Sequence, residues 1–424
     1  MVKWIWLNLL LNTKMKRLFF LTCCLLFVCR GYAQQTMTLA SVLENVEKNN
    51  PLLQSYSNKI EADKAMVGSA NAWNAPRAGL ELDANPYSFD DFYTGMIRTS
   101  VTQEFPNRSN ISAKRDYLTS LSQITMHESM SQKNKLLAQA KETYYEIYIT
   151  QKKIHISKEN IKLLEAMIVL AEKQLATGKE ELATVFKLKA KLTEKQTMLI
   201  HDENMIKANI ASLNYLMNAD INQHFEIDTN NIVKDYRSLI YVFTKDSIEA
   251  KRSDIMQMSN LVNSMKLNQN VISSRAKPIF GMKLEHFAIP NKPDKFSVMG
   301  TMTIPFVPWS ARGYKSEGKA MNFRIAAVEQ EKQQMINMAS QMIKMLVIEM
   351  NSEYQEIDNY KTKVIPAYQK SMDAYILAYG QNTSNLFMIL MAYDDLQMAQ
   401  MEYLKHLEVL LKVQVDYEKE LQIR

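Results

Sequence analysis

The chain of 424 residues contains little cysteine, glycine or proline, and it lacks the usual catalytic signatures. Its three cysteines, Cys23, Cys24 and Cys29, all lie within the first 33 residues, so the rest of the chain can form no disulfide. No nucleophile elbow, phosphate loop, dinucleotide-binding fingerprint or zinc-ligand spacing occurs in the sequence. These absences disfavour an enzyme and indicate a protein without a cofactor.

The N-terminus has the features of a secretory signal peptide. A basic cluster precedes an apolar run from Leu18 to Val28, and small residues end the segment at Ala33. The run is shorter than the ~20 residues of a transmembrane helix, so residues 1–33 are predicted to be a signal peptide. Translation from Met15 instead of Met1 would leave the same signal. A lipoprotein signal is the alternative, but no small pair follows a leucine just ahead of any cysteine.

The chain also lacks a strong excess of either charge. The formal net charge is +6, from 51 basic and 45 acidic residues, and five basic residues lie in the predicted signal. The remaining chain therefore carries 46 − 45 = +1, which gives no electrostatic basis for binding nucleic acid. The six histidines show no metal-ligand spacing: His127, His155, His201, His224, His286 and His406.

The sparse glycines and prolines reveal an internal duplication. Pairs of identical residues recur at a fixed offset of 202 positions: Pro76 and Pro278, Gly79 and Gly281, Gly178 and Gly380, Leu188 and Leu390, Ala190 and Ala392. We therefore predict one repeat over residues 34–218, a linker segment over 219–246 and a second repeat over 247–424.

Each repeat is predicted to contain two long helices in an antiparallel pair. No glycine or proline occurs from 107 to 177, and an apolar residue returns there every seven positions, at Ala140, Ile147, Ile154, Ile161, Ile168 and Leu175. A second seam, offset by three or four, runs through Leu137, Tyr144, Leu164 and Ala171. Similar stretches cover 179–218, 319–379 and 384–424, with Pro366 expected to kink the third. Gly178 and Gly380 are interpreted as the turns between paired helices. Shorter helices are expected over 41–72 and 247–274.

Two windows alternate apolar and polar residues, which predicts strands instead of helices. They cover 79–84 with 96–105, and 281–286 with 298–306. Strands of this length can cross an outer membrane when alternate side chains face lipid. Two isolated hairpins would leave their edges uncovered, so closure by other subunits is expected.

The sequence resembles the TolC-like outer-membrane efflux proteins. The resemblance rests on the strand-to-helix corners at 101–106 and 304–309, and on the two helix turns with their following Leu-x-Ala motifs. The corner residues are Phe105, Pro106, Pro305, Phe306 and Pro308. The family implies a mixed α/β membrane protein with long coiled-coil helices that form a tunnel. It further implies four membrane β-strands per subunit and a homotrimer with a twelve-stranded β-barrel.

The same resemblance implies a location and partners. The channel would lie in the outer membrane of a Gram-negative bacterium, in contact with its lipid, and extend into the periplasm. It would receive substrates from an inner-membrane pump and a periplasmic adaptor. The implied adaptor-facing tips are Gly178, Lys179, Gly380, Gln381 and Asn382.

The implied constriction departs from the family pattern. Where family members carry acidic residues just after the last helix turn, this chain has Met388 and Met391, and the first repeat has Phe186 and Lys189. With 28 methionines in the chain, one hypothesis is passage of copper(I) or silver(I), which thioethers bind well. The alternative is that methionine simply fills irregular helix seams. A periplasmic coiled-coil adaptor or scaffold remains the alternative function, although it would not need four membrane-length strands.

Overall fold

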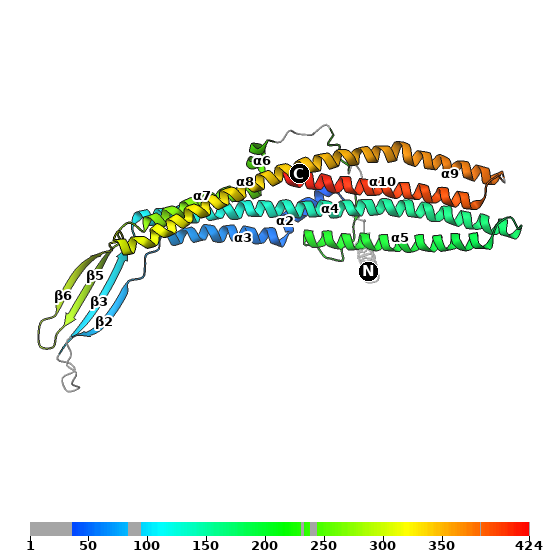
Figure 1. The fold of residues 1–424 in the computed structure, drawn as a ribbon. Helices are drawn as coiled ribbons and strands as arrows, with labels where there is room; N and C mark the ends of the chain where they lie inside the picture. The colour runs from blue at the N-terminus through cyan, green and yellow to red at the C-terminus, as the bar shows by residue number, and fades with distance from the viewer. Residues whose placement is uncertain (1–35, 84–94, 230–232, 238–243, 382, 424) are drawn as a thin grey trace, which may run out of the picture. The chain divides into compact units, whose positions relative to one another are not determined.

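The computed structural model describes residues 36–83, 95–229, 233–237, 244–381 and 383–423. The predicted signal peptide and Asn382 of the predicted tip lie outside these residues. The long helices are α4 (Arg108–Ala176), α5 (Leu182–Met217), α8 (Pro308–Asn359), α9 (Ile365–Gly380) and α10 (Leu386–Leu421) (Figure 1). They confirm the four predicted long helical stretches.

The shorter helices are interrupted where the sequence analysis expected continuous segments. The first segment forms α2 (Leu39–Asn49), α3 (Pro51–Met66) and a 3-10 turn (Val67–Asn71). The side chain of Asn50 accepts a hydrogen bond from the Leu52 amide at 3.0 Å, and Pro51 occupies the first turn, where its missing N–H has no helical partner. The second segment likewise divides at Arg252 into α6 (Lys245–Lys251) and α7 (Ser253–Ser274).

Pro366 is accommodated by a change of helix type. A π-helical turn, Tyr360–Val364, joins α8 to α9, and the Ile365 amide donates to the Tyr360 carbonyl five residues back. Proline lacks an amide hydrogen and its ring crowds the preceding turn, so a wider turn at this place lets the helix continue. The predicted interruption is therefore observed as a π-turn.

Four antiparallel strands form one sheet in the order β2-β3-β5-β6 (Figure 1). The strands are β2 (Arg77–Asp83), β3 (Met96–Phe105), β5 (Phe280–Ala288) and β6 (Lys295–Met302). β2–β3 and β5–β6 are the hairpins of the two predicted repeats, and the pairing of β3 with β5 joins the repeats in one sheet. The predicted strands are confirmed, and their alternation gives the sheet two chemically different faces.

The first described residues pair with the segment predicted to link the repeats. β1 (Thr36–Met37) and β4 (Glu226–Ile227) form a short parallel sheet. The phenol of Tyr144 on α4 lies 3.0 Å from the Met37 carbonyl and 2.8 Å from the Asp228 carbonyl. This pairing was not among the predictions from the sequence. In it, one buried tyrosine ties two distant segments to a long helix.

The α4 helix buries one of its two predicted seams fully. Leu137, Tyr144, Leu164 and Ala171 are all buried. The other seam is buried at Ala140, Ile147 and Ile168 and only half-buried at Ile154, Ile161 and Leu175. The spacing of apolar residues thus identified both stripes, while neighbouring helices decide which stripe becomes the core.

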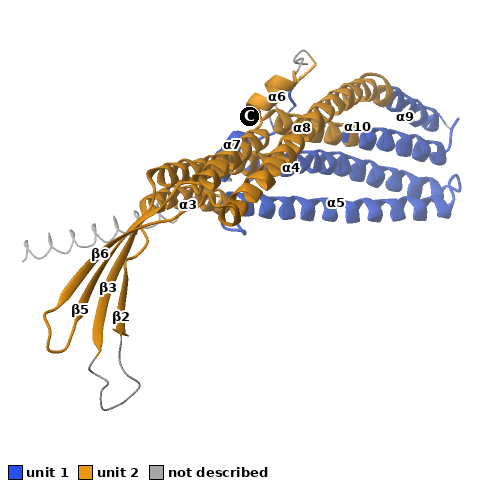
Figure 2. Cartoon of the chain, turned by 60° about the vertical axis from the view of Figure 1, so that its left-hand side comes forward, with its two compact units in different colours: residues 1–46, 140–234, 367–404 blue, residues 47–139, 235–366, 405–424 orange. Residues whose placement is uncertain are grey.

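The chain divides into two compact units, coloured separately in Figure 2. Unit 1 comprises Met1–Val46, Ala140–Lys234 and Ala367–Leu404, and unit 2 comprises Glu47–Gln139, Asp235–Pro366 and Lys405–Arg424. Unit 2 contains the four-stranded sheet, and unit 1 contains the two helix turns at Gly178 and Gly380. Each unit takes segments from both predicted repeats, whose boundaries stay a prediction.

Candidate functional site

One face of the four-stranded sheet is apolar and exposed. Because side chains alternate along each strand, the cross-strand register places Ala78, Val101, Leu284 and Val298 in one row of this face. Leu80 is 73% exposed and Phe296 is 78% exposed. The other large apolar residues on this face are exposed as well: Leu82, Ile97, Val101, Phe105, Phe280, Met282, Leu284, Val298 and Met302. Three polar residues, Thr99, Gln103 and His286, share this face with the apolar side chains. An exposed apolar surface of this extent marks a site of contact with lipid or another apolar partner.

The opposite face of the same sheet is polar and contains ion pairs. Arg98 pairs with Glu81 at 3.1 Å and also with Asp83. Lys283 lies 2.6 Å from Glu285, a carboxylate that is buried in the chain. A sheet with one apolar and one charged face can separate a hydrocarbon phase from water.

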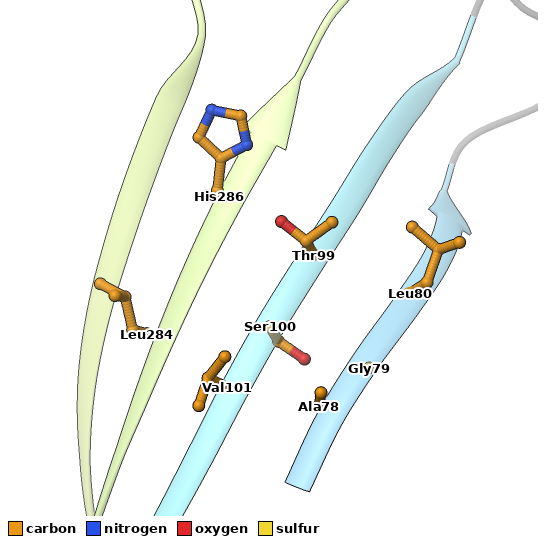
Figure 3. Close-up of a pocket in the computed structure, with 8 residues that line it drawn as sticks. All are labelled: Ala78, Gly79, Leu80, Thr99, Ser100, Val101, Leu284 and His286. Carbon is orange, nitrogen blue, oxygen red and sulfur yellow. The ribbon is translucent and has the colours of Figure 1, made fainter. Parts of the chain in front are cut away.

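An open hollow of about 400 Å³ lies on the sheet, shown in Figure 3. Its lining residues are Ala78, Gly79, Leu80, Thr99, Ser100, Val101, Leu284 and His286. His286 Nε2 faces Asp294 Oδ2 at 3.2 Å, and both side chains are about half exposed. The residues that line the hollow include a single imidazole and no carboxylate.

The predicted strand-to-helix corners contain aromatic residues and prolines in defined positions. Phe105 ends β3 and packs edge-to-face on Trp73, with 5.5 Å between the ring centroids. Pro308 is the first residue of α8, where a missing amide hydrogen costs nothing. Pro106 and Pro305 lie between strand and helix at their corners, and Phe306 is exposed.

The predicted tips lie at the same end of the unit 1 helices (Figures 1 and 2). Gly178 lies two residues beyond the last residue of α4 and adopts the left-handed conformation, with φ of +68°. The Lys179 amide then donates to the Gln174 carbonyl at 3.0 Å. Gly380 differs, because it is the last residue of α9 and shows no positive φ; Gln381 follows it.

The four predicted constriction residues lie on two helices of unit 1. Phe186 and Lys189 are exposed on α5, and Lys189 pairs with Glu172 at 2.7 Å. Met391 is exposed on α10, and the half-buried Met388 lines an open hollow of about 550 Å³ beside the second tip.

Two contacts between α5 and α10 lie within three residues of these positions. The Lys187 ammonium lies 4.9 Å from the centroid of the Phe387 ring, and Lys191 forms an ion pair with Asp394. The structure therefore brings the two helices together near the predicted constriction. That the four residues form a constriction stays a prediction.

Buried polar groups next to this contact were missed by the sequence analysis. Lys195 is buried on α5, and burial lowers the pKa of its ammonium. Burial raises the pKa of the Tyr393 phenol, whose oxygen has no hydrogen-bond partner among the described residues. The apolar periodicity of the helices gave no signal for these positions, because lysine and tyrosine are usual on solvated helix faces.

Within the described residues no helix is long and apolar enough to cross a membrane. The same part of the chain brings no three histidine, cysteine, aspartate or glutamate side chains together in a group that could hold a metal ion.

Comparison with solved structures identifies the fold. The outer-membrane channel OprN matches with a TM-score of 0.76 at 13% identity, over 90% of this chain and 89% of OprN. CusC, a protein that forms a transmembrane channel, matches with a TM-score of 0.77 at 12% identity, over 90% of this chain and 91% of CusC. The chain has the TolC-like fold.

A third structure of this fold is the CmeC outer-membrane channel of Campylobacter jejuni, with a TM-score of 0.70 at 12% identity, over 90% of this chain and 85% of CmeC. No protein-family model and no curated protein matches the sequence. The TolC-like resemblance inferred from corners and helix turns is therefore confirmed at the level of fold.

Proposed function

We propose that the chain is the outer-membrane channel subunit of a tripartite efflux system in a Gram-negative bacterium. It would conduct substrates passively across the periplasm and outer membrane, without a cofactor. The observation that carries this proposal is the two-faced sheet of unit 2, in which an exposed apolar face lies opposite a face containing Arg98 and Lys283 ion pairs. The TolC-like fold supports the same reading.

The sheet also supports a homotrimer. Among the described strands β2 and β6 stand at the two edges, each with one unpaired side. Edge strands of an apolar sheet need partners, and pairing β6 of one copy with β2 of the next would supply them. Three copies would close a twelve-stranded barrel with the apolar face toward lipid.

We place the adaptor and the inner-membrane pump at the helix-turn end of unit 1. The support is the group of exposed apolar side chains beside both turns, Leu182, Phe186, Leu377 and Phe387, next to the predicted tip residues. A soluble periplasmic scaffold is the alternative function. Cell fractionation separates the two, because a channel is recovered with the outer membrane and a scaffold with the soluble periplasm.

Single-channel conductance tests the pore and its proposed constriction together. We expect small conductance from the wild type and a larger one from M388G/M391G, because truncation removes two side chains from the narrowing. M398G/M401G is the matched control, with the same change at the same spacing further along α10. An equal rise in both variants would show that glycine only weakens the helix. A protein that neither inserts nor conducts would favour the scaffold.

Heavy-metal ions are the substrate class that we propose for this channel. The exposed Met391 and the neighbouring Met388 offer thioethers, which suit copper(I) and silver(I). M388L/M391L keeps the apolar volume and removes the sulfur atoms, so it should lower copper or silver resistance while trimer assembly and drug export stay unchanged. Equal resistance would instead favour methionine as packing material.

A further inference from the structure

Four methionines form one stripe along α8. Met335 and Met338 are three residues apart, and Met342 and Met345 repeat this pair seven residues later. Residues three or four apart on a helix are neighbours, with about 5–6 Å between their Cβ atoms. The spacing of 3, 4 and 3 therefore keeps all four thioethers on the same side of the helix.

The stripe is not the surface by which α8 packs against the rest of the chain. Met338, Met342 and Met345 are 59%, 45% and 53% exposed, and Met335 is partly buried. The packing seam of the helix lies one position further on and is aliphatic. Its members are all buried: Ile336, Ala339, Ile343 and Leu346.

Methionine also occurs in the core of this chain, which provides an internal comparison. Met321 and Met350 belong to the same helix and are only 6% and 4% exposed. Gap-filling explains buried methionines of this kind, because a flexible thioether adapts to irregular space. It does not explain a row of methionines outside the core.

The residues at both ends of the stripe are acidic. Glu331 lies four positions before Met335, Glu349 lies four positions after Met345, and both are exposed. Lys332, which pairs with Glu249, and the exposed Lys344 lie in the same stretch of the helix, so the carboxylates flank the row without giving it a net negative charge. In the described part of the chain no group of histidine, cysteine and carboxylate side chains offers a competing site for harder ions such as zinc.

We propose that Met335, Met338, Met342 and Met345 form a row of thioether ligands that binds soft monovalent cations, copper(I) or silver(I). Neutral thioether ligands select soft ions and need no deprotonation, so binding would persist into mildly acidic conditions. The inference that these methionines contact an exported substrate rests on the function proposed above. The inference that they bind metal is tested by a binding measurement alone.

The experiment uses the full chain purified in detergent, in chloride-free buffer, with silver nitrate as the probe. Silver bound per chain is counted by equilibrium dialysis and elemental mass spectrometry. The variant M335L/M338L/M342L/M345L keeps apolar volume and helix propensity but removes four sulfur atoms. M321L/M350L/M372L makes the same change at buried positions.

We expect the stripe variant to bind at least one silver ion fewer per chain than the wild type, and the buried control to bind as many as the wild type. Equal silver binding by the wild type and the stripe variant would overturn the proposal. If that variant then showed only an altered oligomer melting temperature, the stripe would be a packing seam for a second copy. Conductance of the same wild-type sample separates the two proposals, because silver binding without a pore would refute the channel and leave the site.

Discussion

Placing arginine on the apolar face of the sheet should prevent insertion into a membrane. Val298 is exposed on β6 and lies in a cross-strand row with Leu284 and Val101. This row crosses β3 near the middle of that strand. An arginine at the bilayer midplane of a membrane strand costs about 2–4 kcal/mol. A cost of this size lowers the equilibrium constant for insertion of one chain roughly 30- to 700-fold. Three copies in the proposed trimer would raise the cost to about 6–12 kcal/mol.

The neighbouring position provides the matched control. Ser297 precedes Val298 on β6, points to the opposite face and pairs in register with Glu285. An arginine there would meet a carboxylate in place of hydrocarbon. We expect V298R to stay out of phosphatidylcholine vesicles and of the outer-membrane fraction, while S297R inserts like the wild type. Normal insertion of V298R, or an equal defect in both variants, would show that this face does not contact lipid.

Two further predictions concern assembly of the sheet and the tie between distant segments. G281A should destabilise the sheet by about 1–3 kcal/mol, because a Cβ at Gly281 would lie 2.5 Å from Thr301 Oγ1. G300A should leave the yield of inserted protein unchanged, because a Cβ at Gly300 would meet nothing within 4 Å. Y144F should cost about 1–3 kcal/mol by removing a buried hydrogen-bond donor, seen as a lower melting temperature in detergent. Burial raises the pKa of Tyr144 to about 12, so the folded protein keeps this proton between about pH 10 and pH 12 while the unfolded chain loses it. Wild-type stability should therefore fall as pH rises through that window, and an unchanged slope in Y144F would contradict this role for the phenol.

The sequence predicted the long elements of this fold because each has a period that its own residues reveal. The absence of glycine and proline between 107 and 177 predicted α4 to within one residue at each end, and alternation predicted β3. The break at Asn50 and Pro51 also has a local cause, a capping side chain followed by proline, that an amphipathic pattern alone conceals.

Features that depend on distant partners could not be predicted in this way. β1 and β4 have two residues each and lie about 190 positions apart, so neither has a periodicity of its own. The burial of Lys195 depends on how α5 meets its neighbours, which a single helix does not encode. The apolar face of the sheet was predictable from alternation, whereas the contacts near the proposed constriction depend on the folded chain.

The close approach of a facing hydroxyl at Gly79 and Gly281 restricts how this sequence can vary. A Cβ at Gly79 would lie 2.9 Å from Ser100 Oγ, just as one at Gly281 would meet Thr301. In each hairpin, therefore, a glycine on one strand permits a hydroxyl on the other. We expect substitutions to occur in pairs, with a side chain gained at the glycine tolerated only when the facing hydroxyl is lost. Each of the two hairpins would then keep a compensating pair of its own.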